Sequence, residues 1–203
     1  MKNDASIEHF NKNAANWDSR RTSGQLQMLP SLLLEKIVLN AQDRVLDFGA
    51  GTGLLSKAIA PFVAEVTALD TSANMLAVLD SHGISNIQTV EQDIFNGLGT
   101  QHDLIVSSMA MHHVEDTQRL FHAFYQVLAV GGRLALIDLY KEDGSFHGDN
   151  EGKGVKHFGF VPEELTAIAS SVGFQDIQFS TIHQLTRDNG RTYPLFLMQA
   201  VKY

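Results

Sequence analysis

A chain of 203 residues is long enough to bury the core of one ordinary domain. Its 15 basic and 23 acidic side chains give a formal charge of −8, which argues against a general basic surface for nucleic acid. It contains no cysteine, which excludes disulfides, thiolate metal ligands and cysteine nucleophiles. No apolar run approaches the roughly 20 residues of a membrane span, and the first residues lack a secretory signal pattern. We therefore expect a cytoplasmic globular protein.

Short apolar runs rich in β-branched residues alternate with amphipathic segments, a pattern typical of βαβ units and a parallel sheet. Helices are expected in residues 1–40. Strands are then expected near 44–48, 65–70, 86–90, 103–108 and 133–139.

Helical patterns fill the intervals between these strands. The first runs from residue 53 towards Pro61, and the second follows Ser72, which is a candidate N-cap. The third has apolar residues at helical spacing over 120–128, and Gly131-Gly132 are expected to stop it.

The pattern changes after the fifth strand. Pro162 is expected to open a helix that closes at Gly173. Two final apolar runs, 175–182 and 193–201, are joined by a turn that contains Asn189-Gly190, a typical hairpin signal. The fold class is therefore α/β, with a mostly parallel sheet that ends in an antiparallel C-terminal hairpin.

Small residues follow the first predicted strand at Gly49-Ala50-Gly51-Thr52-Gly53. They let the backbone approach a ligand closely, and the next helix directs its free N–H groups to the same place. The spacing differs from the Gly-x-Gly-x-x-Gly of dinucleotide sites, because residue 54 is Leu.

Three aspartates lie at the ends of successive predicted strands, where ligands of open α/β sheets bind. Asp47 would repel a pyrophosphate but suits a ligand with an amino group and a sulfonium. Asp70 can accept hydrogen bonds from the two hydroxyls of a ribose. Asp93 can accept from an adenine amino group, with Ile94 against the ring.

These segments resemble the cofactor motifs of class I S-adenosylmethionine-dependent methyltransferases. The resemblance covers roughly residues 40–140 and is greatest to the small-molecule group of types 11 and 12, which includes ubiquinone and menaquinone methyltransferases. The motifs occur in the family's order: VLDFGAGTG at 45–53, ALDTS at 68–72, QDI at 92–94, DLIVSSMAMHHV at 103–114 and LAVGGRL at 128–134.

The resemblance implies a Rossmann-like three-layer sandwich and S-adenosylmethionine as the cofactor. It implies one domain over 1–203, with a helical cap at 1–40, a cofactor-binding core at 41–140 and a substrate-side loop, helix and hairpin at 141–203. Asp47 and the glycine turn would hold the amino-acid part, Asp70 the ribose and Asp93 the adenine. The expected cofactor residues are Trp17, Asp47, Gly49, Ala50, Gly51, Gly53, Asp70, Thr71, Ser72, Met75, Asp93, Ile94, Ser107 and Ser108.

Methyl transfer needs alignment of donor and acceptor, and a base only where the acceptor must lose a proton. His112, His113 and His157 are the candidate catalytic residues, although His112 or His113 can equally cap or pack under the next helix. Trp17, the only tryptophan, either faces the sulfonium or packs between cap and sheet. We expect no metal site, because the polar loop that contains His147 is typical of a solvated segment.

The acceptor class is narrowed by what the sequence lacks. Without cysteine the covalent route to C5 of cytosine is closed, and no two prolines are adjacent, so the Asp/Asn-Pro-Pro-aromatic motif of many amino-group methyltransferases is missing. A small-molecule acceptor is expected, with no nucleic-acid partner; the oligomeric state is not predicted. Two alternatives are a non-catalytic cofactor-binding regulatory module and a nicotinamide-dependent oxidoreductase.

Overall fold

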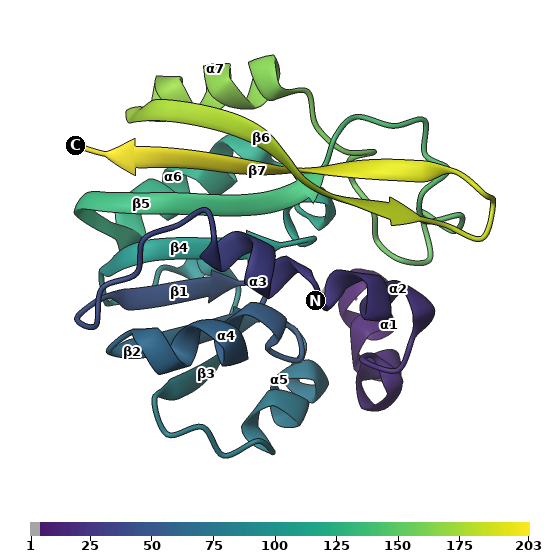
Figure 1. The fold of residues 1–203 in the computed structure, drawn as a ribbon, viewed down its shortest axis with the longest axis horizontal. Helices are drawn as coiled ribbons and strands as arrows, with labels where there is room; N and C mark the ends of the chain where they lie inside the picture. Colours follow the sequence, from purple (N-terminus) through teal and green to yellow (C-terminus); the bar gives the residue numbers. More distant parts are fainter. Residues whose placement is uncertain (1–4) are drawn as a thin grey trace.

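The computed structural model describes residues 5–203 and contains one seven-stranded sheet (Figure 1). The spatial order is β3-β2-β1-β4-β5-β7-β6. The first five strands run parallel, and β7 pairs antiparallel with both β5 and β6. The strands are β1 (Arg44–Phe48), β2 (Glu65–Asp70), β3 (Ile87–Glu91), β4 (His102–Ser108), β5 (Leu128–Leu139), β6 (Phe174–Thr186) and β7 (Thr192–Lys202).

Seven α-helices and four short 3-10 turns are found in the described part of the chain. None of these helices is long and apolar enough to cross a membrane. The α-helices are α1 (Ala5–Asn13), α2 (Arg21–Leu26), α3 (Leu29–Leu34), α4 (Leu54–Ile59), α5 (Ala73–Asp80), α6 (Thr117–Val127) and α7 (Pro162–Val172). The 3-10 turns are η1 (Ala14–Asn16), η2 (Ala60–Phe62), η3 (Ile94–Asn96) and η4 (Met111–His113).

Strands β1 and β2 have the predicted bounds, and β3 and β4 differ by one residue. The prediction for the third helix was wrong at its end, because α6 stops at Val127 and the chain enters β5 directly. Gly131, with a φ of 78°, lies inside β5 rather than at a helix terminus. There the pairing between β4 and β5 shifts register, since His102 faces Leu128 but Leu104 faces Arg133.

The C-terminal prediction is confirmed. Helix α7 begins at Pro162 and ends at Val172, and its C-cap Gly173 has a left-handed backbone. Strands β6 and β7 form the antiparallel hairpin, with Gly190 at a φ of 76° in its turn. The predicted N-cap is also present, because the Ser72 hydroxyl accepts a hydrogen bond from the Met75 N–H.

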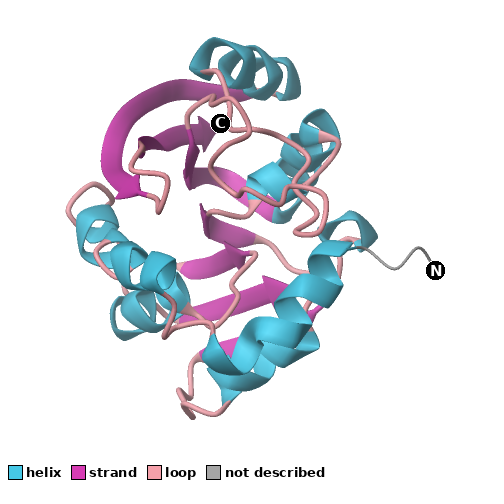
Figure 2. Ribbon diagram, turned by 90° about the vertical axis from the view of Figure 1, so that its right-hand side faces the viewer, coloured by secondary structure: helices cyan, strands magenta, loops and turns pink. Residues whose placement is uncertain are grey.

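Helices cover both faces of the sheet, so the predicted three-layer α/β sandwich is confirmed (Figure 2). The alternation of side chains along each strand produces the two cores. Leu46 and Phe48 of β1 pack with α6 and α7, whereas Val45 packs with α3 and α4.

The strand order reverses between β1 and β4, which are neighbours although β2 and β3 lie between them in sequence. Such a reversal leaves a crevice at the carboxyl ends of the strands, because the connections on either side lead to opposite faces of the sheet. The N-terminal helices α1 and α2 lie beyond these ends in Figure 1. This edge of the sheet is therefore where a ligand site is expected.

Candidate functional site

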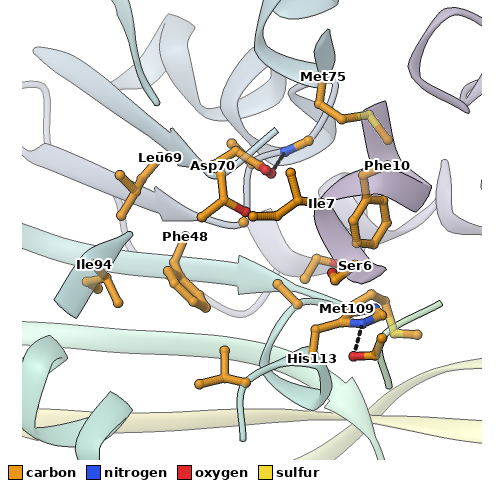
Figure 3. A pocket seen from close by; sticks show the side chains of 18 of the residues that line it. Ser6, Ile7, Phe10, Phe48, Leu69, Asp70, Met75, Ile94, Met109 and His113 are labelled. Carbon is orange, nitrogen blue, oxygen red and sulfur yellow. Dashed lines mark hydrogen bonds between the residues drawn. The ribbon is translucent and has the colours of Figure 1, made fainter. Parts of the chain in front are cut away.

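A cavity of about 920 Å³ lies at the carboxyl ends of β1, β2 and β4 (Figure 3). Its walls come from the turn after β1, the ends of β2 and β4, η3, helix α1 and the loop 150–158. Asp70 and Met75 lie towards one end in Figure 3, and His113 and Met109 towards the other. The volume falls within the roughly 300–1,000 Å³ typical of small-ligand pockets.

The backbone of the glycine turn is left-handed at all three glycines. Gly49, Gly51 and Gly53 all have positive φ, at 68°, 56° and 81°. A Cβ on Gly51 would meet no atom within 4 Å, so this residue borders open space in the cavity. A Cβ on Gly53 would instead collide with Leu79 of α5, so Gly53 serves the packing of helix against turn.

Asp70 ties the glycine turn to the start of α5. One carboxylate oxygen accepts from the Gly51 N–H at 2.8 Å, and the other accepts from the Ser72 N–H at 2.8 Å. Burial raises the pKa of Asp70, and these backbone hydrogen bonds oppose the shift. Asp70 therefore shapes the turn as well as lining the cavity.

Asp47 is only 2% exposed and is bound to helix α4. Its Oδ2 accepts from the Ser56 N–H at 3.0 Å and from the Ser56 hydroxyl at 2.6 Å. Burial raises its pKa to about 6, because the charged form loses its hydration. A cation in the cavity would favour the ionised form of this carboxyl group.

The side wall is formed by the segment after β3. Asp93 accepts from the Phe95 N–H at 2.9 Å and so caps η3, and Ile94 is 3% exposed. Both line the cavity. The adenine-binding role of Asp93 and Ile94 stays a prediction, and their position in the wall of the cavity is compatible with it.

Eleven of the fourteen predicted cofactor residues line the cavity. They are Trp17, Asp47, Gly49, Ala50, Gly51, Asp70, Thr71, Met75, Asp93, Ile94 and Ser108. Gly53, Ser72 and Ser107 do not. The Ser72 hydroxyl donates to Asn11 Oδ1 at 2.7 Å while capping α5, and the buried Ser107 hydroxyl donates to the Phe48 carbonyl at 2.8 Å.

The three candidate catalytic histidines are placed differently. Only His113 lines the main cavity. His112 is fully buried, and its Nδ1 lies 2.7 Å from Asp138 Oδ1. His157 lines neither cavity, because its Nε2 lies 2.9 Å from the Val114 carbonyl and 3.3 Å from the Thr117 hydroxyl. The geometry therefore assigns His157 to the packing of the loop.

His113 has a defined orientation. Its Nδ1 lies 3.2 Å from the carbonyl oxygen of Gly154, which can only accept, so Nδ1 carries the proton. Burial lowers the pKa of His113 well below its usual value, and the neighbouring His112 lowers it further. The ring is therefore neutral near pH 7 with its lone pair at Nε2.

Trp17 lines the cavity, and the guanidinium carbon of Arg20 lies 4.7 Å from its ring centroid. Phe10 contacts it edge-on at 5.2 Å between centroids. The cap therefore presents aromatic surface to the ligand space, while Arg20 already stacks on the Trp17 ring.

Several residues of the site were not predicted. Asp138, His147 and Asn150 are the main ones. Asp138 has a sequence signal as a carboxylate within the apolar strand β5, and His147 was considered only as a metal ligand in a loop expected to be solvated. Among the described residues, the buried Ser108 Oγ and Asn150 Oδ1 have no hydrogen-bond partner, and both residues line the main cavity. Such atoms mark positions where a ligand can supply the missing partner.

Comparison with known proteins agrees with this geometry. A family model described as "Methyltransferase domain" matches residues 46–136. An uncharacterized methyltransferase of Schizosaccharomyces pombe is 31% identical over 140 residues, which cover 60% of this chain and 49% of that protein. The chain thus spans about half the length of that relative.

A second relative is matched almost end to end. The ubiquinone biosynthesis O-methyltransferase of Xanthomonas axonopodis pv. citri is 28% identical, over 92% of this chain and 88% of that one. The solved structure of the DhpI–SAH complex superposes with a TM-score of 0.75 over 98% of this chain and 95% of that one, at 22% identity. Residues 46–136 therefore match a methyltransferase domain, and the relatives together with the shared fold support a class I S-adenosylmethionine-dependent methyltransferase.

Proposed function

We propose that this chain transfers a methyl group from S-adenosylmethionine to a small-molecule acceptor held beside His113. One observation carries the proposal: a single cavity extends from the glycine turn and Asp70, where the cofactor motifs meet, to His113 at the end of β4. Cofactor and acceptor can therefore occupy the same enclosed space.

The residues present fit S-adenosylmethionine. Gly51 leaves open the space that a side chain would fill. Asp47 and Asp70 supply negative charge on the side where a cationic ligand would lie. The unpartnered Ser108 hydroxyl is an available partner for the polar amino-acid part. When bound, the cofactor supplies a methyl group that its sulfonium already activates.

The chain itself has to align the acceptor and exclude water. Phe10 and Trp17 of the N-terminal segment and Val155 of the loop close the cavity from above the strand ends. His113 can accept a proton at Nε2 from an acceptor hydroxyl or amine, because its Nδ1 proton is engaged with Gly154. An acceptor that is already deprotonated would need only orientation from this ring.

The non-catalytic alternative predicts that the space at residues 107–113 is blocked. Ser108, Met109, Ala110 and His113 instead line the cavity. The geometry therefore favours an enzyme over a module that only binds the cofactor.

The proposal is tested by measuring S-adenosylhomocysteine release from S-adenosylmethionine against a library of small metabolites. At least one acceptor should give turnover. The His113→Gln variant should then lose about 100-fold or more in rate while binding the cofactor normally, as expected for loss of a general base. Turnover with no acceptor, despite normal cofactor binding, would favour the regulatory module.

A further inference from the structure

A second, smaller cavity of about 120 Å³ adjoins the first. Five residues line both cavities: Phe10, Trp17, Leu26, Met109 and His113. A group held in the second cavity therefore lies next to whatever occupies the His113 end of the first.

The walls of the second cavity are strongly basic. Seven of its thirteen lining residues are His, Lys or Arg, and none of the described lining residues is acidic. Three of the seven, Arg20, Lys153 and Arg187, are half-buried cations. The chain as a whole has a formal charge of −8, so this concentration of positive charge is local.

Contacts with aromatic rings and backbone carbonyls hold the three cations in place. The guanidinium carbons of Arg20 and Arg187 lie 4.7 and 4.8 Å from the ring centroids of Trp17 and Phe146. Arg187 Nε donates to the Phe146 carbonyl at 2.9 Å, and Lys153 Nζ donates to the His147 carbonyl. The binding groups are thus positioned in advance of any ligand.

Burial and the neighbouring positive charges both disfavour the charged forms of Lys153 and His147. Burial lowers the pKa of Lys153, and the charges of Arg187 and Arg20 lower it further, against a smaller opposing effect of Asp149. Burial also lowers the pKa of His147, helped by His112, His113, Lys153 and Arg187. An anion in this cavity would relieve the repulsion and replace lost hydration.

We propose that the second cavity binds an anionic group of the methyl acceptor, a carboxylate or a phosphate. The inference rests on the proposed methyltransferase function and adds a substrate class to it. Lys153 and Arg187 hold the anionic oxygens, and the rest of the acceptor passes Met109 into the main cavity, with its reacting atom beside His113.

A metal ion is the competing occupant. One nitrogen from each of His112, His113 and His147 lies within 4.8 Å of the others. Asp138 contacts Nδ1 of His112 and so orients its ring, as carboxylates do for many metal-binding histidines. A dication would, however, be repelled by Arg20, Lys153 and Arg187. The described lining residues include no carboxylate, and Asp138 behind His112 is a single negative charge against these three cations. The charge around the cavity favours the anion.

The test uses protein saturated with S-adenosylhomocysteine and treated with a chelator. Inorganic phosphate or sodium acetate is titrated while the fluorescence of Trp17 is followed, with sodium chloride at the same ionic strength as the reference. Trp17 is the only tryptophan and lines the cavity, so its emission reports on this site. At least one anion should give a saturable response with a dissociation constant of about 1 mM.

The variants Lys153→Gln and Arg187→Gln should each weaken anion binding about tenfold, as expected for loss of a charged hydrogen-bond donor. Lys141→Gln, a charge change at an exposed residue of the same loop region, should leave it unchanged. Tighter binding of phosphate than of acetate identifies a phosphate-bearing acceptor, and the reverse order a carboxylate.

Three results would overturn the proposal: no saturable response to either anion up to about 50 mM, unchanged affinity in both cavity variants, or anion binding that appears only after Zn²⁺ is added. The last would identify a metal centre, and His147→Gln should then abolish it. Binding of S-adenosylhomocysteine is measured first, so failure of the methyltransferase proposal is seen separately from failure of this one.

Discussion

Replacing Asp70 with Asn tests whether the carboxylate that shapes the glycine turn also controls cofactor affinity. Its two oxygens accept separately from the N–H groups of Gly51 and Ser72. An amide keeps one acceptor and turns the other position into a donor, so one backbone N–H loses its partner. The negative charge is lost as well. The change is therefore small in volume but affects both the turn and the electrostatics of the cavity.

The magnitude follows from these bonds. A hydrogen bond to a charged group contributes about 1.5–3 kcal/mol, and an unsatisfied buried donor costs about 1–3 kcal/mol. Asp70→Asn should therefore weaken S-adenosylhomocysteine binding by about 1–3 kcal/mol, which is about 5- to 150-fold. The melting temperature should also fall by several degrees, since about 1 kcal/mol corresponds to about 2–4 °C in a chain of this size.

Isothermal titration calorimetry at pH 7.5 measures the affinity, and circular dichroism the melting temperature. Asp80→Asn is the matched control, because Asp80 is exposed and its carboxylate accepts from the Thr89 hydroxyl outside the cavity. The reasoning is refuted if folded Asp70→Asn binds within about twofold of the wild type. Such a result would mean that the ribose is held elsewhere.

Three further predictions concern the same region. Gly51→Ala and Gly53→Ala both place a side chain at positive φ, so both should lower the melting temperature. Gly53→Ala should lower it more because its Cβ also meets Leu79, and Gly51→Ala should weaken cofactor binding more because its methyl group enters open cavity space; equal effects in the two variants would contradict this. The pKa of Asp47 is about 6 in the folded protein against 3.8 in the unfolded chain, so the folded state holds a proton that the unfolded state has lost, and the contribution of Asp47 to stability falls as the pH rises through this range. In urea unfolding between pH 4.5 and 7.5, the free energy of unfolding of the wild type should fall by roughly 2 kcal/mol relative to that of Asp47→Asn. Parallel pH profiles of the two proteins would refute this. His157→Ala should lower stability by about 1 kcal/mol through lost loop hydrogen bonds and leave S-adenosylhomocysteine affinity unchanged; weaker binding would return His157 to the site.

Local sequence patterns predicted much of the secondary structure. The alternation of apolar runs predicted the strand positions, and residue types with fixed backbone preferences predicted Ser72, Pro162 and Gly173 at helix ends. The prediction for the end of α6 was wrong because a pair of glycines is typical both of the end of a helix and of an irregularity within a strand, and Gly131-Gly132 lie in the strand β5. Whether such glycines end a helix or lie within a strand depends here on the pairing of residues 128–139 with β4, and the local sequence holds no information about that pairing.

The same distinction holds for the site. The part of the cavity beside the glycine turn lies at three strand ends, and motif order along the chain predicted most of the residues that line it. The sequence did not show which of two adjacent residues lines the cavity. Ser107 and Ser108 point to opposite faces of the sheet, and only Ser108 lines the cavity. The region around His113 depends on contacts between distant segments, such as those of His112 with Asp138 and His147. The positions of these residues in the sequence do not reveal that they are in contact.

The central claim is that S-adenosylmethionine binds in the cavity beside the glycine turn. Calorimetry with S-adenosylmethionine, on wild type and Gly51→Val, tests it most directly. For the wild type we expect one site per chain with a dissociation constant of tens of micromolar or tighter. A folded Gly51→Val protein should lose this binding, because the valine side chain would fill the open space at residue 51. No heat of binding to the wild type at about 100 µM ligand, or equal affinity in the variant, would contradict the account.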